Sequence, residues 1–213
     1  MKIKKPITTA LFLIISFISI GQEKSWHWSI EYAHGIGTPI FSNSNIELQE
    51  NMESTIRSGF SQNVFIGGGC TFNEKWSINV GVGYKSLTYN NDSLGIEAVT
   101  MISKKFSGLE IPLLIQHPYS KKGWFIGIGG MYFKGIQDKT SYQLLNNNQR
   151  QHSKESSDLK GIGYQMQLGK QFKPDDHHVL SVRCIGQYYP NLHATSSNTF
   201  GFWDVSLGLG ITF

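Results

Sequence analysis

The chain has 213 residues, with 23 Gly, 13% aromatic residues and a formal net charge of +4. Three of the excess positive charges come from Lys2, Lys4 and Lys5, so the rest of the chain is nearly neutral and gives no electrostatic reason to expect nucleic-acid binding. After residue 21 no apolar run reaches the length of a membrane-spanning helix, which excludes a helical membrane protein.

Residues 1–21 have the parts of a secretory signal peptide. Lysines near the start precede an apolar run from Ala10 to Ile20, and small residues stand where a signal peptidase would cut before Gln22. The run is shorter than the about 20 residues that a transmembrane anchor needs. No Cys lies near this point, so we expect no lipid anchor. We predict a cleaved signal over residues 1–21 and one domain over residues 22–213.

Apolar residues alternate with small or polar ones in eight segments of the remaining chain, and this period of two predicts β-strands. Trp76, Ile78 and Val80, for example, alternate with Ser77 and Asn79. No segment has a convincing helical period, although part of 45–57 would allow a helical turn or two. The predicted strands lie near 25–37, 60–73, 76–89, 100–117, 124–136, 160–173, 179–190 and 201–213.

The predicted connections alternate between long and short. Such alternation is expected of antiparallel strands that run up and down, with both termini on the side of the short turns. The longest connection, 137–159, is polar and is either a recognition loop or a non-specific surface cover. The long connections are 38–59, 90–99, 137–159 and 191–200, and the short ones are 73–75, 118–123 and 174–178.

The small and polar residues that alternate with the apolar ones form one face of each strand, which we call the polar parity. Their composition indicates which face of the sheet is inside. This parity is rich in Gly, Ser, Asn and Gln with isolated charges, whereas a solvated sheet face is usually rich in Lys, Glu and Thr. A crowded barrel interior accounts for that composition, with the apolar parity facing lipid. We therefore predict an all-β fold, an eight-stranded antiparallel up-and-down transmembrane β-barrel. The alternative is a soluble sandwich with its apolar faces turned inward.

Aromatic residues gather near both ends of the predicted strands, as expected of two belts at the two membrane interfaces. In a sandwich the same residues would be core aromatics. The belt at the short-turn side would contain Trp26, Trp28, Trp76 and Trp124, and the belt at the long-loop side Tyr84, Tyr89, Tyr132 and Tyr188.

Charged residues on the inward parity are candidates for a polar cluster in the interior. An unpaired buried charge is costly, so we expect Arg183 or Lys85 to contact Glu110 or Glu31. We predict a structural role for this cluster, with a proton or ligand site in the lumen as the alternative. Its predicted members are Glu31, Lys85, Glu110, Arg183 and Asp204.

Pro112 lies inside a predicted strand of a barrel that has no free edge. Because Pro cannot donate a ladder hydrogen bond, we predict a bulge or local kink there.

No catalytic, cofactor or metal site is predicted. Residues of one tight turn, 174–178 with its two Asp and two His, rarely converge on a metal. No Ser and His of the predicted strands share a face by their spacing, as a nucleophile and its base must. Cys70 and Cys184 lie on strands that are not neighbours, so we expect no disulfide between them.

Several features together resemble a known family. The chain ends in alternation that closes on Phe213, and the predicted cleavage falls between Gly21 and Gln22. In these respects the chain resembles the small outer-membrane β-barrels of Gram-negative bacteria, with an OmpX- or OmpA-like architecture. The segment "GLEIPLLIQ" at 108–116 is similar to one in PorT-like barrels. The resemblance implies an outer-membrane location with periplasmic termini, and recognition of Phe213 by the barrel-assembly machinery.

Three functions fit this prediction. The first is a barrel without enzymatic activity that stabilises the envelope or binds a ligand or surface through its outer loops. The second, implied by the PorT-like resemblance, is an accessory component of a secretion or gliding assembly. The third is a lipid-modifying enzyme of the outer membrane. The partners expected are membrane lipid and the assembly machinery, and an envelope protein is a further candidate.

Overall fold

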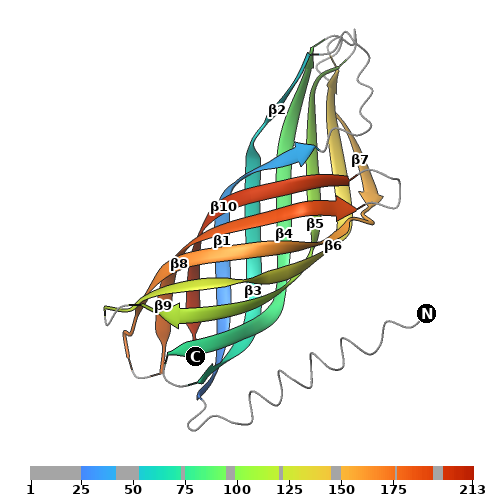
Figure 1. Ribbon diagram of the computed structural model, residues 1–213. Helices are drawn as coiled ribbons and strands as arrows, with labels where there is room; N and C mark the ends of the chain where they lie inside the picture. The colour runs from blue at the N-terminus through green and yellow to red at the C-terminus, as the bar shows by residue number, and fades with distance from the viewer. Residues whose placement is uncertain are drawn as a thin grey trace, which may run out of the picture.

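A computed structural model describes residues 25–41, 53–72, 75–94, 99–119, 122–144, 150–175, 177–193 and 199–213. The predicted signal peptide, residues 1–21, lies outside these residues. The described residues form one antiparallel sheet that closes into a tilted barrel (Figure 1). Its strands are β1 (Ser25–Phe41), β2 (Glu53–Arg57), β3 (Gly59–Phe72), β4 (Trp76–Leu94), β5 (Val99–Pro118), β6 (Trp124–Leu144), β7 (Arg150–Ser156), β8 (Lys160–Phe172), β9 (Val179–His193) and β10 (Thr199–Thr212).

The barrel wall has eight strands, in the order β1, β3, β4, β5, β6, β8, β9 and β10. β10 returns to pair with β1, from Ser29 opposite Thr212 to Phe41 opposite Phe200. The last residue completes this seam, because the N–H groups of Phe213 and Trp28 each donate to the other residue's carbonyl, at 2.8 and 3.2 Å. Closure leaves no unpaired strand edge, which a membrane would penalise. The predicted fold class is confirmed.

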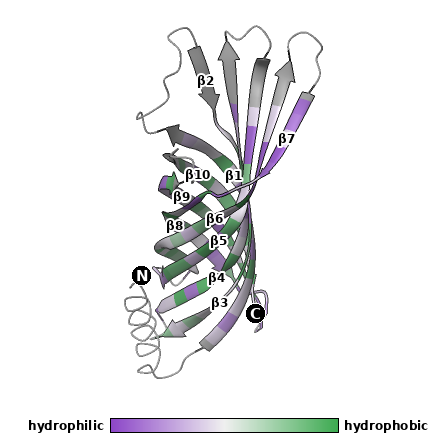
Figure 2. Ribbon diagram, turned by 90° about the vertical axis from the view of Figure 1, so that its right-hand side faces the viewer, coloured by the Kyte–Doolittle hydropathy of each residue, from purple (hydrophilic) through white to green (hydrophobic). Residues whose placement is uncertain are grey.

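Side chains alternate between the two faces of the wall as the sequence predicts. On β8, Ile162 is 65% exposed whereas Gln167 is 1% exposed. Hydrophobic residues recur along the barrel strands in Figure 2, where β7 is hydrophilic. Since the exposed parity is apolar and the enclosed parity polar, the outer surface suits lipid. Among the described residues, no helix is both long and apolar enough to cross a membrane.

Five strands continue past the rim of the barrel at the long-loop end, and we call this part the extension (Figures 1 and 2). It consists of β2, β7 and the adjoining ends of β4, β5 and β6; β2 pairs with β4 and β7 pairs with β6. The sequence predicted loops here, which is wrong for the described residues. Of the range 45–57, in which a helical turn was allowed, residues 53–57 form β2 and the rest lies outside the described residues. Most residues of the extension are polar, so its strands lack the regular alternation by which strands are recognised.

The irregularity predicted at Pro112 takes the form of a gap in one ladder and not of a bulge. In this described stretch Pro112 lies opposite Met131 of β6 without any shift in register. On the other side, the ladder between β4 and β5 lacks its pairs at Ile111 and Pro112 and resumes in the same register at Leu113. Pro has no N–H to donate, and the barrel accommodates it by omitting two pairs instead of inserting a residue.

The short turn before β6 depends on a glycine. Gly123 has a φ of +83°, a left-handed conformation that side chains disfavour. Its carbonyl accepts a hydrogen bond from the Gln171 N–H at 2.8 Å, and the Tyr119 N–H donates to the Trp124 carbonyl at 3.1 Å. These contacts hold the turn against the end of β8.

Candidate functional site in the barrel interior

Three charged side chains from three strands meet in the middle of the barrel. Lys85 Nζ of β4 lies 2.9 Å from Asp204 Oδ1 of β10 and 3.9 Å from Glu110 Oε1 of β5. All three side chains are buried. Each points inward because it has the parity opposite to the lipid-facing residues beside it. One cation between two carboxylates gives this central cluster a formal charge of −1, so neutral donors must stabilise the carboxylates.

Neutral polar side chains supply those donors. Ser61 Oγ donates to Asp204 Oδ2 at 2.7 Å, and Asn63 Nδ2 donates to Glu110 Oε2 at 2.6 Å. The sequence analysis missed these residues, although their inward parity was a signal that could have identified them. Glu110 also accepts from Gln187 Nε2 at 3.0 Å and from the Tyr189 hydroxyl, and Lys85 donates to Gln187 Oε1.

A second ion pair lies nearer the short turns. Arg183 Nη1 of β9 is 2.6 Å from Glu31 Oε1 of β1. Arg183 Nε donates to Ser181 Oγ at 3.1 Å, and the guanidinium lies 5.4 Å from the centre of the Phe125 ring. The structure thus divides the five predicted interior residues into two groups, one of Lys85, Glu110 and Asp204 and the other of Glu31 and Arg183.

A cavity of about 420 Å³ lies between the second ion pair and the short turns. Glu31 and Arg183 line its inner end, together with His27 and Asn79. A hydrogen bond of 2.8 Å joins His27 Nε2 to Asn79 Oδ1, so this nitrogen carries the proton. The central cluster separates this cavity from the far end of the barrel.

The interior toward the long loops is filled by apolar and aromatic side chains. The Tyr89 and Phe106 rings stack with centroids 5.7 Å apart, and Phe133 meets Tyr189 edge to face at 5.9 Å. The sequence analysis did not predict this cluster and placed Tyr89 in an interface belt; that placement is wrong, because Tyr89 is 4% exposed. The apolar cluster consists of Leu87, Tyr89, Phe106, Met131, Phe133, Leu159, Tyr189, Leu192 and Phe202.

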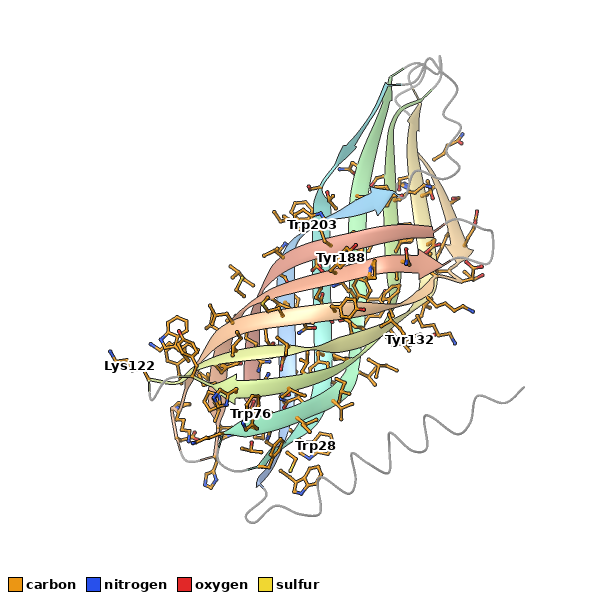
Figure 3. All side chains as sticks on the ribbon, in the orientation of Figure 1. Trp28, Trp76, Lys122, Tyr132, Tyr188 and Trp203 are labelled. Atoms are coloured by element: carbon orange, nitrogen blue, oxygen red, sulfur yellow. The ribbon has the colours of Figure 1, made fainter. Side chains whose placement is uncertain are left out.

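The other predicted belt residues lie on the outer face. Trp28 and Trp76 lie near the short-turn end in Figure 3, and Tyr132 and Tyr188 lie toward the opposite end. Trp203 was missing from the predicted belts but lies opposite Tyr188 in the register of β9 and β10. The residues predicted for the two belts and exposed in the structure are Trp26, Trp28, Trp76, Trp124, Tyr84, Tyr132 and Tyr188.

The turn at 174–178 has a local structural role. Asp175 Oδ1 accepts the backbone N–H groups of His177 and His178, at 2.8 and 2.7 Å, and also contacts the His178 ring at 2.9 Å. In the part of the chain that the structure describes, no three His, Cys, Asp or Glu side chains are grouped as metal ligands. Cys70 and Cys184 are free.

One Ser–His contact, which the spacing did not reveal, lies in the extension. The Ser141 hydroxyl is 2.8 Å from His152 Nδ1, across β6 and β7. Both residues were assigned to a loop in the sequence analysis, so no shared face was expected. The pair is solvent-exposed, and no carboxylate is recorded against His152 among the described residues.

The solved structures that are similar to this chain include other bacterial surface and outer-membrane proteins. The surface protein NspA of Neisseria is 13% identical, with 90% of this chain and all of that chain covered at a TM-score of 0.48. OprG from Pseudomonas aeruginosa is 17% identical, with 90% and 97% covered at a TM-score of 0.46. No curated protein matches the chain.

The prediction that the chain has no enzymatic activity, which was made from the spacing of its Ser and His residues, does not stand. The similar structures include the outer-membrane protease OmpT of Escherichia coli, which is 8% identical, with 92% of this chain and 99% of that chain covered at a TM-score of 0.45.

The model of one protein family matches residues 21–197, which is most of the chain. That family is described as the outer membrane protein β-barrel domain. The match agrees with the closed barrel, the apolar outer face and the polar interior. The chain belongs to the outer membrane protein β-barrel domain family.

Proposed function

We propose that this outer-membrane barrel is a surface recognition protein that binds its ligand on the extension. Two observations together carry the proposal: side chains block the lumen at its middle and toward the long loops, and strands continue beyond the rim. The central cluster and the apolar cluster occupy successive levels of the interior. A barrel of eight strands has room for side chains but not for an aqueous channel, which leaves the outside of the molecule for binding.

The proposed orientation puts the short turns and both termini in the periplasm and the extension outside the cell. The longer connections of such barrels are extracellular and the shorter ones periplasmic. Paired strands hold the extension in a fixed shape, so recognition would cost less conformational entropy than binding through free loops.

Site-specific photocross-linking in the native outer membrane tests this function. A photoreactive residue replaces Thr140 or Ser153 of the extension, or Lys122 of a short turn as the matched control. Recognition at the extension predicts one reproducible cross-linked species from the first two positions and none of that species from Lys122. The same products from both ends, or none from the extension, would contradict the proposal.

A second candidate is an accessory role in a secretion or gliding assembly. It rests on the segment 108–116, whose residues resemble a segment of PorT-like barrels. In the same experiment this role predicts cross-links from Lys122 to envelope-assembly proteins, because an assembly in the periplasm would meet the short turns. The position of the cross-link therefore separates the two candidates.

A further inference from the structure

Lysines face one another directly across the strands of the outer wall. Lys139 of β6 lies opposite Lys105 of β5 on one side and opposite Lys154 of β7 on the other. Closer to the barrel, Lys134 of β6 lies opposite Lys160 of β8. All five side chains are exposed. Directly opposed residues of an antiparallel pair point to the same face, where like charges destabilise the pairing.

None of the described residues paired with these lysines is acidic, although the exposed carboxylate of Asp158 lies two residues before Lys160 and has a contact of its own. The carboxylates of the same region, Asp138 and Glu155, lie in the neighbouring row with Phe106 and so belong to the opposite face. Burial of Phe106 in the apolar cluster identifies that opposite face as the inner one. Within the described parts of the chain, none of the five lysines has an ion pair. Five unpaired cations in two rows attract an anionic ligand that supplies several negative charges.

The two lysine rows continue the lipid-facing surface. The last row that is apolar on all three strands β5, β6 and β8 consists of Ile111, Tyr132 and Ile162, all exposed. The lower lysine row, Lys134 and Lys160, comes next along the strands, two residues further out. Two further exposed apolar residues, Leu109 and Ile136, lie beside and beyond the lower lysine row. The upper row, with Lys105, lies about 13 Å along β5 from Leu109, which pairs with Lys134. The rows therefore begin where the acyl chains end and the headgroups start.

We propose that the outer face of β5, β6, β7 and β8 binds the phosphate groups of lipid headgroups in the leaflet at the long-loop end. Ammonium groups and phosphate oxygens form charge-assisted hydrogen bonds, and the apolar row below accepts the acyl chains of the same lipid. The lower row contacts a phosphate at the glycerol level, and the upper row contacts phosphates carried further out on the headgroup. Because the upper row lies on the extension, this contact would hold the extension at the membrane surface.

The experiment uses the full chain in nanodiscs of phosphatidylcholine that contain phosphatidylglycerol or phosphatidylinositol bisphosphate. Native mass spectrometry counts the lipids that remain bound after detergent release. The wild-type protein is expected to retain both anionic lipids over phosphatidylcholine, and the bisphosphate more strongly. Lys134→Gln/Lys160→Gln lowers retention of phosphatidylglycerol at least about five-fold. Lys105→Gln/Lys139→Gln/Lys154→Gln removes the additional retention of the bisphosphate.

The control Lys75→Gln/Lys122→Gln/Lys173→Gln removes three charges at the short-turn end and is expected to retain lipid like the wild type. Equal loss in this control would show a net-charge effect and overturn the proposal, as would equal retention of all lipids by the wild type.

Free phosphate and heparin are tested on protein in pure phosphatidylcholine. If either binds with a dependence on the lysine rows while lipid retention does not depend on them, the site takes a soluble anion and the proposal is wrong. Retarded migration of unheated samples on gels verifies that each variant is folded.

Discussion

Lys85 and Asp204 are 119 residues apart in the chain, and their Nζ and Oδ1 atoms meet at 2.9 Å inside the barrel. The contact joins β4 to β10 across the interior, not along the wall. Glu110 adds a second carboxylate at 3.9 Å from the same ammonium group. Lys85 therefore supplies the positive charge that compensates the negative charges of two buried carboxylates, Asp204 and Glu110.

Replacing Lys85 tests this dependence. Lys85→Met leaves Asp204 and Glu110 without a cation and should lower the free energy of unfolding by about 3–5 kcal/mol. Adding Asp204→Asn to the same protein should recover part of the loss, since one buried charge disappears. Urea unfolding in lipid vesicles, followed by tryptophan fluorescence, measures both values. Lys173→Met, an exposed lysine at the short-turn end, should change little; a similar loss there would contradict the explanation.

Two consecutive tyrosines provide an internal comparison. Tyr189 is fully buried and donates its hydroxyl to Glu110, whereas Tyr188 is 42% exposed on the outer face. Tyr189→Phe removes a donor from a buried carboxylate and should cost about 1–3 kcal/mol in the same unfolding assay. Tyr188→Phe should cost less, because its hydroxyl is at the surface. Equal costs would mean that the bond to Glu110 does not stabilise the barrel.

Asp138 of the extension should make stability depend on pH. Burial raises the pKa of Asp138, and the nearby carboxylates of Asp158 and Glu155 raise it further, against the opposing effects of Ser157 and Lys104. Stability is therefore lost as the pH rises from the ordinary carboxyl pKa through the raised one. Asp138→Asn, which imitates the protonated form, should be more stable than the wild type at pH 7 and equal to it at low pH. Melting temperatures measured across this pH range test the effect, and Glu155→Gln should show a smaller change of the same kind. Melting temperatures of Asp138→Asn and of the wild type that changed with pH in parallel would disprove the effect.

Phe213 has two separable roles, one in its backbone and one in its side chain. Deleting the residue removes both hydrogen bonds to Trp28, so the folded fraction after refolding in detergent should fall. Phe213→Ala keeps the backbone bonds and should refold like the wild type in vitro. If the side chain is the assembly signal, as we predict, Phe213→Ala should lower the amount of folded protein in the outer membrane. If Phe213→Ala assembled in cells as well as the wild type, the Phe213 side chain would not be the assembly signal.

Much of this protein follows from its sequence alone. Along each strand, apolar residues alternate with Gly, Gln and single charged residues. The apolar set is exposed on the outer face and the other set is enclosed. This alternation determines the barrel fold and the face on which each residue lies. The inward parity of Lys85, Glu110 and Asp204 was readable for this reason. Alternation is a local property, and each strand of the wall carries it independently of its neighbours.

Only the tertiary structure decided which residues meet. Lys85 pairs with Asp204 and Arg183 with Glu31 because strand register and tilt fix the height of each side chain inside the closed wall, and neither is encoded in one strand. The lysine rows depend on register in the same way, since a shift of one residue would move Lys139 to the other face. The extension gave little local signal because most of its residues are polar, and its strands are positioned by the strands with which they pair.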